Sequence, residues 1–199
     1  MCANPVHHHW LDQARNPVNH DPSLHPIPDS YWAVPGQILA GEYPGAIADE
    51  DARQKLQSLL SAGVTTFFDL TQAGEYGLKP YFLLAVEEAA TRKRTIHHRR
   101  FPIRDMHVPS PEGLRHILDS IDEAVAAGEL LYVHCFGGIG RTGTVIGAYY
   151  VRHGMTGEDA IAKIARLRFG IPDGARQSPE TDAQQRLVLT WPEGGNLER

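Results

Sequence analysis

The sequence predicts an α/β fold that forms one domain. Short runs of β-branched and aromatic residues alternate with longer segments whose apolar residues recur at helical spacing. Between residues 130 and 143, a strand-like apolar run, a glycine-rich loop and a helix-compatible run follow one another directly. The chain has 199 residues, of which 42% are hydrophobic and 22% charged, which is ordinary for a globular domain with a sizeable core. Together these observations favour helices packed against a sheet.

The order of the elements follows from local patterns and from the residues that interrupt them. Residues 1–28 are rich in Pro, His and Asn and are expected to be irregular, which leaves residues 29–199 as the single domain. A hairpin is predicted to open the sheet, with strands at 31–34 and 37–40 around the turn dipeptide Pro35-Gly36. Further strands are predicted at 64–70, 95–103 and 130–134, and helices at 49–62, 80–92, 111–127, 142–153, 156–168 and 179–191.

The stretch 130–143, which reads LLYVHCFGGIGRTG, carries the strongest chemical signal. Five uncharged residues, three of them glycine, separate Cys135 from Arg141. Glycines allow a loop to curl with its backbone N–H groups pointing inward, and the N-terminus of the following helix adds unpaired N–H groups. Arg141 can bind two oxygens of one phosphate, and a cysteine in this field is expected to ionise more readily than a free one. The sequence therefore predicts a nucleophile at the base of an anion site.

The pattern HC, five residues and RTG resembles the signature loop of the cysteine-dependent protein tyrosine phosphatases, nearest in style to their compact dual-specificity branch. The resemblance covers about residues 31–191, and its specific part is residues 102–143. It implies a three-layer α/β fold in which helices flank a central, mostly parallel sheet of about five strands. It also implies that phosphomonoesters are hydrolysed through a phosphocysteine intermediate, with no cofactor and no metal.

The resemblance assigns roles to the residues of this stretch. Cys135 would attack phosphorus, the Thr142 hydroxyl would stabilise the thiolate, and His134 would shape the loop and favour ionisation of the cysteine. Arg141 and the loop N–H groups would hold the phosphoryl oxygens, and these N–H groups belong to Phe136, Gly137, Gly138, Ile139, Gly140 and Arg141.

A general acid is expected in the loop that reads FPIRDMHVPSP. A leaving alkoxide or phenolate departs faster when it is protonated, and the water that attacks the phosphocysteine needs a base. Asp105 lies 30 residues before Cys135, about where the resembled family has a mobile acid loop, and we assign both roles to it. The alternative is that Asp105 is an ordinary turn residue. Asp119 and Asp122 fall inside the next predicted helix and are poorer candidates, and His107 is a minor alternative acid.

Several other residues have both a functional and a structural interpretation. In related phosphatases a glutamine beyond the loop positions the hydrolytic water; Gln184 is the better candidate, Gln177 the weaker, and a surface glutamine the alternative. Asp69 ends a predicted strand and is expected to cap the next turn. Tyr76 either forms a wall for an aromatic substrate or is a surface residue of its loop. The histidines at 7–9 are interpreted as a solvated run and not as a metal site.

A nucleotide-binding alternative uses the same letters. Gly138, Gly140 and Gly143 spell G-x-G-x-x-G, the dinucleotide fingerprint. That fingerprint requires a strand after the helix, with an acidic residue at the end of the strand. Here a second helix is predicted instead, and Glu158 lies on it. The phosphatase interpretation is therefore favoured.

Composition and charge limit the partners and the compartment. The net charge of −5 argues against broad binding of nucleic acid or of anionic membranes. No signal peptide or bilayer-spanning run is readable, and the two cysteines, Cys2 and Cys135, imply no disulfide framework. A thiol kept reduced for chemistry suits the cytoplasm. The oligomeric state stays open.

The loop residues also bear on the substrate. Relatives that act on polyphosphorylated inositols place basic residues between the cysteine and the arginine, and this loop has none. We therefore expect a phosphorylated protein, or a simple phosphomonoester, with tyrosine or dual specificity. An inositol phosphate or phosphoinositide remains an alternative, because Arg99, Arg100 and Arg104 lie on a neighbouring segment. A phosphate-binding module without turnover is the alternative from another class.

Overall fold

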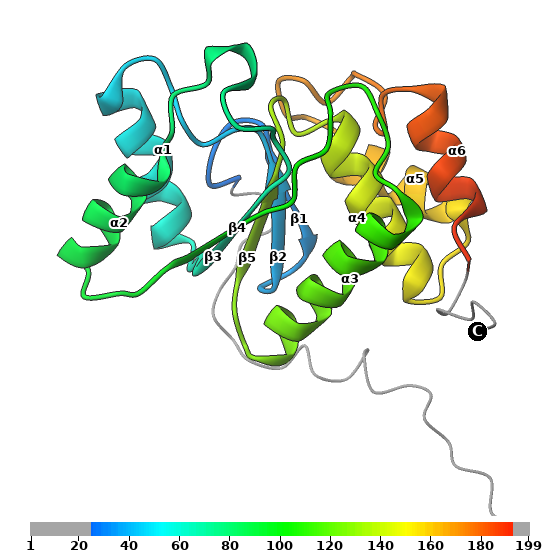
Figure 1. The fold of residues 1–199 in the computed structure, drawn as a ribbon, viewed down its shortest axis with the longest axis horizontal. Coiled ribbons are helices and arrows are strands. Elements are labelled where there is room, and N and C mark those ends of the chain that lie inside the picture. The colour runs from blue at the N-terminus through cyan, green and yellow to red at the C-terminus, as the bar shows by residue number, and fades with distance from the viewer. Residues whose placement is uncertain (1–24, 193–199) are drawn as a thin grey trace, which may run out of the picture.

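A five-stranded sheet forms the centre of the computed structural model, which describes residues 25–192 (Figure 1). The strands lie in the order β1-β2-β5-β3-β4. β1 is antiparallel to β2, and all other neighbours are parallel. The strands span Ser30–Val34 (β1), Ile38–Gly41 (β2), Thr66–Asp69 (β3), His97–Arg100 (β4) and Leu131–His134 (β5). The predicted mostly parallel sheet of about five strands is confirmed.

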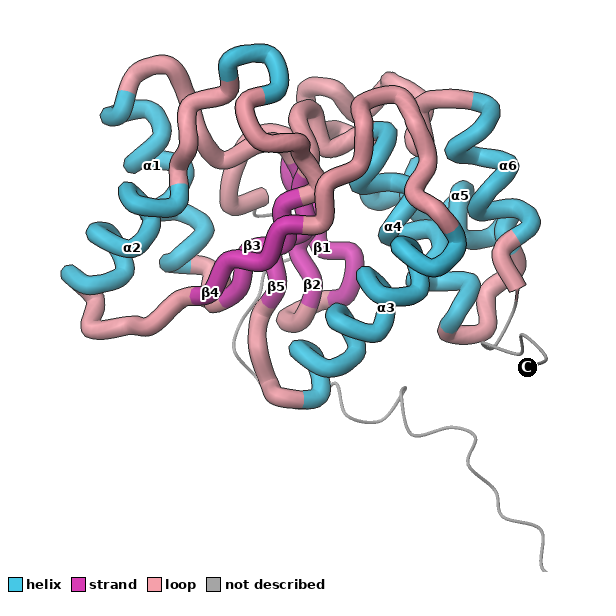
Figure 2. The backbone as a smooth tube through the Cα atoms, in the orientation of Figure 1, coloured by secondary structure: helices cyan, strands magenta, loops and turns pink. Residues whose placement is uncertain are grey.

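Helices cover both faces of this sheet, which gives three layers (Figures 1 and 2). On one face lie α1 (Asp49–Ser61) and α2 (Phe82–Thr91). On the other lie α3 (Pro111–Ala126), α4 (Gly140–Arg152), α5 (Gly157–Leu167) and α6 (Asp182–Thr190). A short 3-10 helix, η1 (Glu75–Gly77), lies in the loop after β3. Between residues 25 and 192, no helix is both long and apolar enough to cross a membrane.

The alternation of side chains along the strands produces two cores. In β3 and β5, Phe68 and Val133 pack toward α3 and α4, whereas Phe67 and Tyr132 pack toward α1 and α2. All four are fully buried, as expected for strands covered on both faces. α4 is buried along almost its whole length, as its apolar sequence predicted. The central strand β5 and the central helix α4 are therefore the most constrained pair of elements, and the loop between them is fixed at both ends.

Some predicted boundaries are wrong, and two of them have a clear local reason. The strand predicted over 95–103 ends at Arg100, because Pro102 has no N–H to donate to the sheet. The helix predicted to start at Pro179 begins only at Asp182, where Thr181 and Gln184 form a capping box. α4 begins two residues before the predicted Thr142, and α2 two residues after the predicted Pro80. The predictions for the histidines at 7–9 and for Cys2 lie outside the described residues, and the division into residues 1–28 and 29–199 stays a prediction.

Candidate active site

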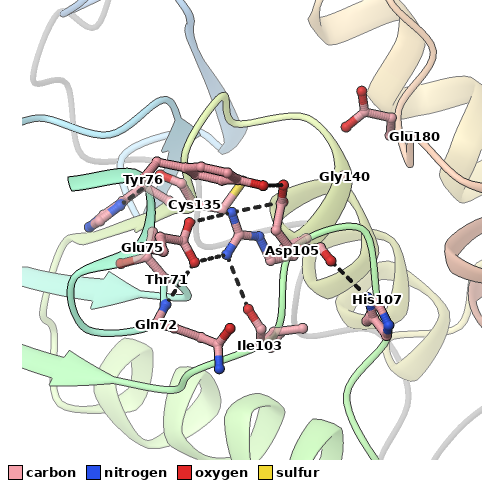
Figure 3. A network of polar contacts seen from close by, with 12 residues as sticks. Thr71, Gln72, Glu75, Tyr76, Ile103, Asp105, His107, Cys135, Gly140 and Glu180 are labelled. Atoms are coloured by element: carbon pink, nitrogen blue, oxygen red, sulfur yellow. Dashed lines mark hydrogen bonds and ion pairs between the residues drawn. The ribbon is translucent and has the colours of Figure 1, made fainter. Parts of the chain in front are cut away.

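The candidate site lies where the central strand meets the central helix. Cys135 follows β5 directly, and α4 begins at Gly140. β5 lies between β2 and β3, so the loops that follow these strands meet at the same edge of the sheet. Loops that follow β3 and β4, which contain Glu75 and Asp105, converge on Cys135 at this edge (Figure 3).

Close backbone packing fixes the shape of loop 135–141. Gly138 has a φ of 68°, and a Cβ built there would lie 2.3 Å from the carbonyl carbon of Gly41, so only glycine fits. The Tyr43 N–H donates to the Phe136 carbonyl at 2.8 Å, and the Ser178 hydroxyl donates to Ile139 at 2.7 Å. The loop is therefore held from two sides.

The backbone N–H groups of this loop remain available for a ligand. Within the part of the chain that the structure describes, the N–H groups of residues 136–141 donate to no protein acceptor. A run of free N–H groups at a helix N-terminus is an anion-binding arrangement. Cys135 lies at its base with only 3% of its surface exposed, and its thiol is in no disulfide.

Arg141 is held by a carboxylate that the sequence did not single out. Its two terminal nitrogens donate to Glu75 at 2.8 and 2.7 Å, and Nη1 also donates to the Ile103 carbonyl at 3.1 Å (Figure 3). The guanidinium is 1% exposed. Burial alone would lower the pKa of Arg141, but its hydrogen bonds to Glu75 and the charges of Cys135 and Glu75 outweigh burial and raise it. The two hydrogen bonds to Glu75 also fix the orientation of this side chain.

Asp105 lies directly beside Arg141. One carboxylate oxygen is 2.9 Å from Nη2 of Arg141, and the other accepts a hydrogen bond from the Tyr76 hydroxyl at 2.7 Å (Figure 3). That hydrogen bond raises the pKa of Tyr76, which keeps the phenol in its donating form. His107, the alternative acid, is turned to the main chain, with Nδ1 2.7 Å from the Asp105 carbonyl oxygen. Asp105 thus lines the same pocket as Cys135, held between Arg141 and Tyr76.

His134 and Thr142 flank the loop in different ways. His134 is fully buried, with Nε2 2.7 Å from the Tyr81 hydroxyl and Nδ1 3.3 Å from the Cys135 carbonyl oxygen. Burial lowers the pKa of His134 to about 4, so the ring is neutral near pH 7 and brings no positive charge to Cys135. The Thr142 hydroxyl is buried and has no hydrogen-bond partner among the described residues. It is free to donate to an acceptor in the site.

The two glutamine candidates differ clearly. Gln184 is fully buried against Gly140, where a Cβ would lie 2.8 Å from its side-chain oxygen. Its Oε1 accepts from the N–H groups of residues 180 and 181, and its Nε2 donates to the His107 carbonyl at 3.2 Å. Gln177 is exposed. Gln184 therefore connects α6 with the loop of Asp105.

The site opens into a pocket of about 460 Å³. Sequence analysis missed several residues that line it or hold it, namely Glu75, Asp173, Arg176 and Glu180. Arg176 contacts both neighbouring carboxylates, with 3.3 Å to Asp173 and 2.5 Å to Glu180. These residues come from loops far from the motif in sequence. The one available signal was their place in loops that follow strand ends or precede α6.

The other sequence candidates have structural roles. Asp119 and Asp122 lie on α3 and pair with Arg152 at the surface. Asp69 accepts from the Thr71 N–H at 2.9 Å, which confirms the predicted turn cap, and from Arg100 at 2.8 Å. The dinucleotide alternative is wrong, because α5 follows α4 and Glu158 lies in the first turn of α5.

This fold, with a buried cysteine and arginine at the two ends of a loop of free N–H groups, defines the class of cysteine-dependent protein tyrosine phosphatases. A family profile described as "Polymorphic toxin system, DSP-PTPase phosphatase" matches residues 42–155, more than half of the chain. The chain belongs to this family, which confirms the class indicated by the motif.

Comparisons with individual proteins agree with this assignment. The chain is 33% identical over 94 residues to the phosphatidylinositol 3,4,5-trisphosphate 3-phosphatase and protein-tyrosine-phosphatase PTEN1 of Arabidopsis thaliana, a match over 46% of this chain and 22% of that protein. It is 30% identical over 128 residues to the triple specificity protein phosphatase PtpB of Mycobacterium tuberculosis, over 63% of this chain and 42% of that protein. The chain thus spans less than half the length of these relatives. The crystal structure of Tk-PTP in its active form superposes with a TM-score of 0.61 and 25% identity, over 81% of this chain and 94% of that one.

Proposed function

We propose that the chain is a cysteine-dependent phosphomonoester hydrolase that acts on phosphorylated proteins with tyrosine or dual specificity. The observation that carries the proposal is the convergence of Cys135, the free N–H groups of loop 135–141, Arg141 and Asp105 on one pocket. These are the groups that phosphoryl transfer to a thiolate requires: a nucleophile, a preorganised anion site and a proton donor.

In the first step, the Cys135 thiolate attacks phosphorus. A sulfur–phosphorus bond forms, the bond from phosphorus to the leaving oxygen breaks, and Asp105 gives its proton to that oxygen. The loop N–H groups and Arg141 hold the equatorial oxygens while negative charge builds up on them. The unpartnered Thr142 hydroxyl is available to donate to the sulfur.

The contacts of Arg141 indicate how substrate enters. Nε is buried and has no hydrogen-bond partner among the described residues, whereas Nη2 is shared by Glu75 and Asp105. A phosphate that binds in bidentate fashion to Nε and Nη2 displaces Asp105 and leaves Glu75 in place. The freed carboxyl can then turn to the leaving group. The binding of substrate therefore also releases the acid into the position where it can protonate the leaving group.

In the second step, water attacks the phosphocysteine. Asp105, now ionised, takes a proton from the water, the sulfur–phosphorus bond breaks, and inorganic phosphate leaves with the thiolate restored. Gln184 supports the loop that carries Asp105 through its hydrogen bond to the His107 carbonyl. Its side-chain oxygen is used within the cap of α6, so we propose for it a role in holding the acid loop.

The charges around the pocket favour a single phosphate. Asp105, Asp173 and Glu180 line it together with Arg141 and Arg176, and Arg176 is paired with two of these carboxylates. Arg99, Arg100 and Arg104 are not among the lining residues. Several phosphates on one ring would meet carboxylates at this rim, which costs binding energy. The three arginines that kept the inositol phosphate alternative open are therefore no support for it. A relative whose name includes a phosphoinositide activity still supports that alternative.

The remaining expectations follow from the chemistry. The thiol of Cys135 must stay reduced, which favours a cytoplasmic location. The net charge of −5 favours neither a nucleic-acid nor a membrane partner. The proposed reaction uses protein groups and water alone, so we expect no cofactor.

Phosphate release in the presence of a chelator tests the proposal. We expect turnover of p-nitrophenyl phosphate and of a phosphotyrosine peptide, with less for inositol hexakisphosphate. Cys135→Ser should reduce kcat by at least about 1,000-fold, and Asp105→Asn by about 100-fold or more. Exchange of Asp119, the surface carboxylate on α3, for Asn is the matched control and should change little. Tight binding of the phosphopeptide without release of phosphate would identify a binding module, and a strong preference for the inositol phosphate would overturn the proposed substrate class.

A further inference from the structure

A second cavity of about 840 Å³ adjoins the active-site pocket. The two cavities share Tyr76, Phe136, Gly137 and Asp173, so a molecule bound at Cys135 can extend from one into the other. We call the second cavity the flanking groove. Beyond the shared residues, its walls come from the segment after β2, from α1 and from the segment that runs from the end of η1 to α2. They comprise Glu42, Tyr43, Gly45, Ala46, Ile47, Lys55, Gly77, Leu78, Lys79 and Pro80.

Apolar side chains with unusual exposure gather around this groove. Ile47 is 97% exposed, Tyr76 70% and Phe136 49%. The rings of Tyr76 and Phe136 lie 5.6 Å apart, and both belong to the boundary between the two cavities. Large apolar groups that gather at an open cavity mark a binding surface more often than scattered ones do.

The charges in the groove are largely neutralised. Lys55 pairs with Glu42 at 2.8 Å, and Lys79 pairs with Asp49 at 2.5 Å. The groove therefore does not attract polyanions. Directly beyond Ile47, the first turn of α1 carries Glu50 and Asp51 after Asp49, and these two add net negative charge that repels an anionic lipid surface.

We propose that the flanking groove binds the apolar residues of a peptide that neighbour its phosphorylated residue. The inference rests on the proposed function and adds the sequence preference of the substrate. The volume of the flanking groove lies in the range of sites that bind a drug-sized ligand, about 300–1,000 Å³. Because the groove is continuous with the active-site pocket, the substrate itself is the occupant that fits it. The neutral charge favours uncharged side chains, and the acidic start of α1 favours a peptide over a membrane lipid.

Paired phosphopeptides test this inference. Both carry one phosphotyrosine; in the first it is flanked on both sides by leucine, and in the second by asparagine, which is polar but uncharged. We expect the native protein to favour the leucine peptide by about 10-fold or more in kcat/KM, as contact with one apolar pocket provides. Ile47→Asp, at a side chain that supports no core, should reduce this preference to near unity. Leu83→Asp is the matched control, because Leu83 is 77% exposed on α2 and lies outside the groove.

The outcomes separate this inference from the proposed function. If p-nitrophenyl phosphate is not hydrolysed, the proposed function fails. If it is hydrolysed but the native protein treats both peptides alike, or Ile47→Asp keeps the preference, only the groove is contradicted. Vesicles that contain a phosphatidylinositol monophosphate are the third substrate. If their hydrolysis exceeds that of the leucine peptide and falls selectively with Ile47→Asp, the occupant is a lipid and the peptide inference is overturned.

Discussion

At the residue scale, the guanidinium of Arg141 lies between carboxylates from two separate loops. Both terminal nitrogens of Arg141 donate hydrogen bonds to Glu75, and Nη2 also forms an ion pair with Asp105. A buried arginine needs such a partner, because an unpaired buried charge costs several kcal/mol, about 3–5 when one partner is removed. Glu75 therefore acts as a positioning residue, and Asp105 is the partner that can exchange with substrate.

Glu75→Gln should lower kcat/KM by roughly 100-fold, because a misplaced guanidinium no longer matches the equatorial oxygens. The variant keeps the shape of the side chain and removes its charge. Steady-state kinetics with p-nitrophenyl phosphate measures the effect. Glu87→Gln, at an exposed partner of Arg53, is the control. If the Glu75 variant stayed within twofold of the native rate, the positioning role would be wrong.

The Tyr76 hydroxyl should help to hold the proton donor. Tyr76→Phe removes the 2.7 Å hydrogen bond to Asp105 and keeps the ring beside Phe136. Because solvent weakens a hydrogen bond at an exposed side chain, we expect a loss of only a few-fold in rate. We expect the loss for an alkyl phosphate, whose leaving group needs the proton, and a smaller loss for p-nitrophenyl phosphate. In the Asp105→Asn background, Tyr76→Phe should have no further effect on the rate. An equal loss in that background would show that Tyr76 does not act through Asp105.

At the element scale, the sequence predicts the elements that carry local signals and misses contacts between distant segments. The strand before Cys135, the buried helix after it and the first hairpin follow from periodicity and turn residues. The pairing of Glu75 with Arg141 joins residues 66 positions apart, and no local pattern encodes it. Gln184 was located by its position beyond the loop, but its burial and its link to the acid loop became visible only through the packing of α6.

Gly138 should be the least replaceable glycine of loop 135–141. Gly138 and Gly128 share a left-handed φ, 68° and 77°, but only Gly138 lies against backbone, whereas a Cβ at Gly128 would meet nothing within 4 Å. Alanine at either position carries a conformational cost of about 1–2 kcal/mol, and at Gly138 the clash with the end of β2 adds to it. Thermal unfolding and phosphate release should therefore suffer more in Gly138→Ala than in Gly128→Ala. Equal losses would show that the packing against β2 does not fix the loop.

At the scale of the whole molecule, two buried titratable groups couple stability to pH. Burial alone would raise the pKa of Asp69, but hydrogen bonds from His98 and Thr71 and the nearby His134 outweigh it and hold the pKa below its usual range. The pKa of His134 falls to about 4 through burial. Asp69 and His134 are neighbours in the register of β3 and β5, at the strand ends that support the active site.

Stability should therefore decrease as the solution becomes more acidic. Because the unfolded state binds a proton at His134 below about pH 6.5 and the folded state only near pH 4, the free energy of unfolding falls across this window. Between pH 7 and pH 5 this histidine accounts for about 2 kcal/mol. The contribution of Asp69 is present above its unfolded pKa, near 3.8, and is lost below it. Urea unfolding of the native protein and of His134→Gln at both pH values measures the difference; equal pH dependence in the two proteins would contradict the assignment.

The central claim is that Cys135 becomes covalently phosphorylated during turnover. Rapid acid quenching of the protein with a ³²P-labelled phosphotyrosine peptide, followed by proteolysis and mass spectrometry, tests this directly. The account predicts a labelled fragment that carries one phosphoryl group on Cys135, and no label in Cys135→Ser. Release of inorganic phosphate without any label on the protein, or with the label on another residue, would contradict it.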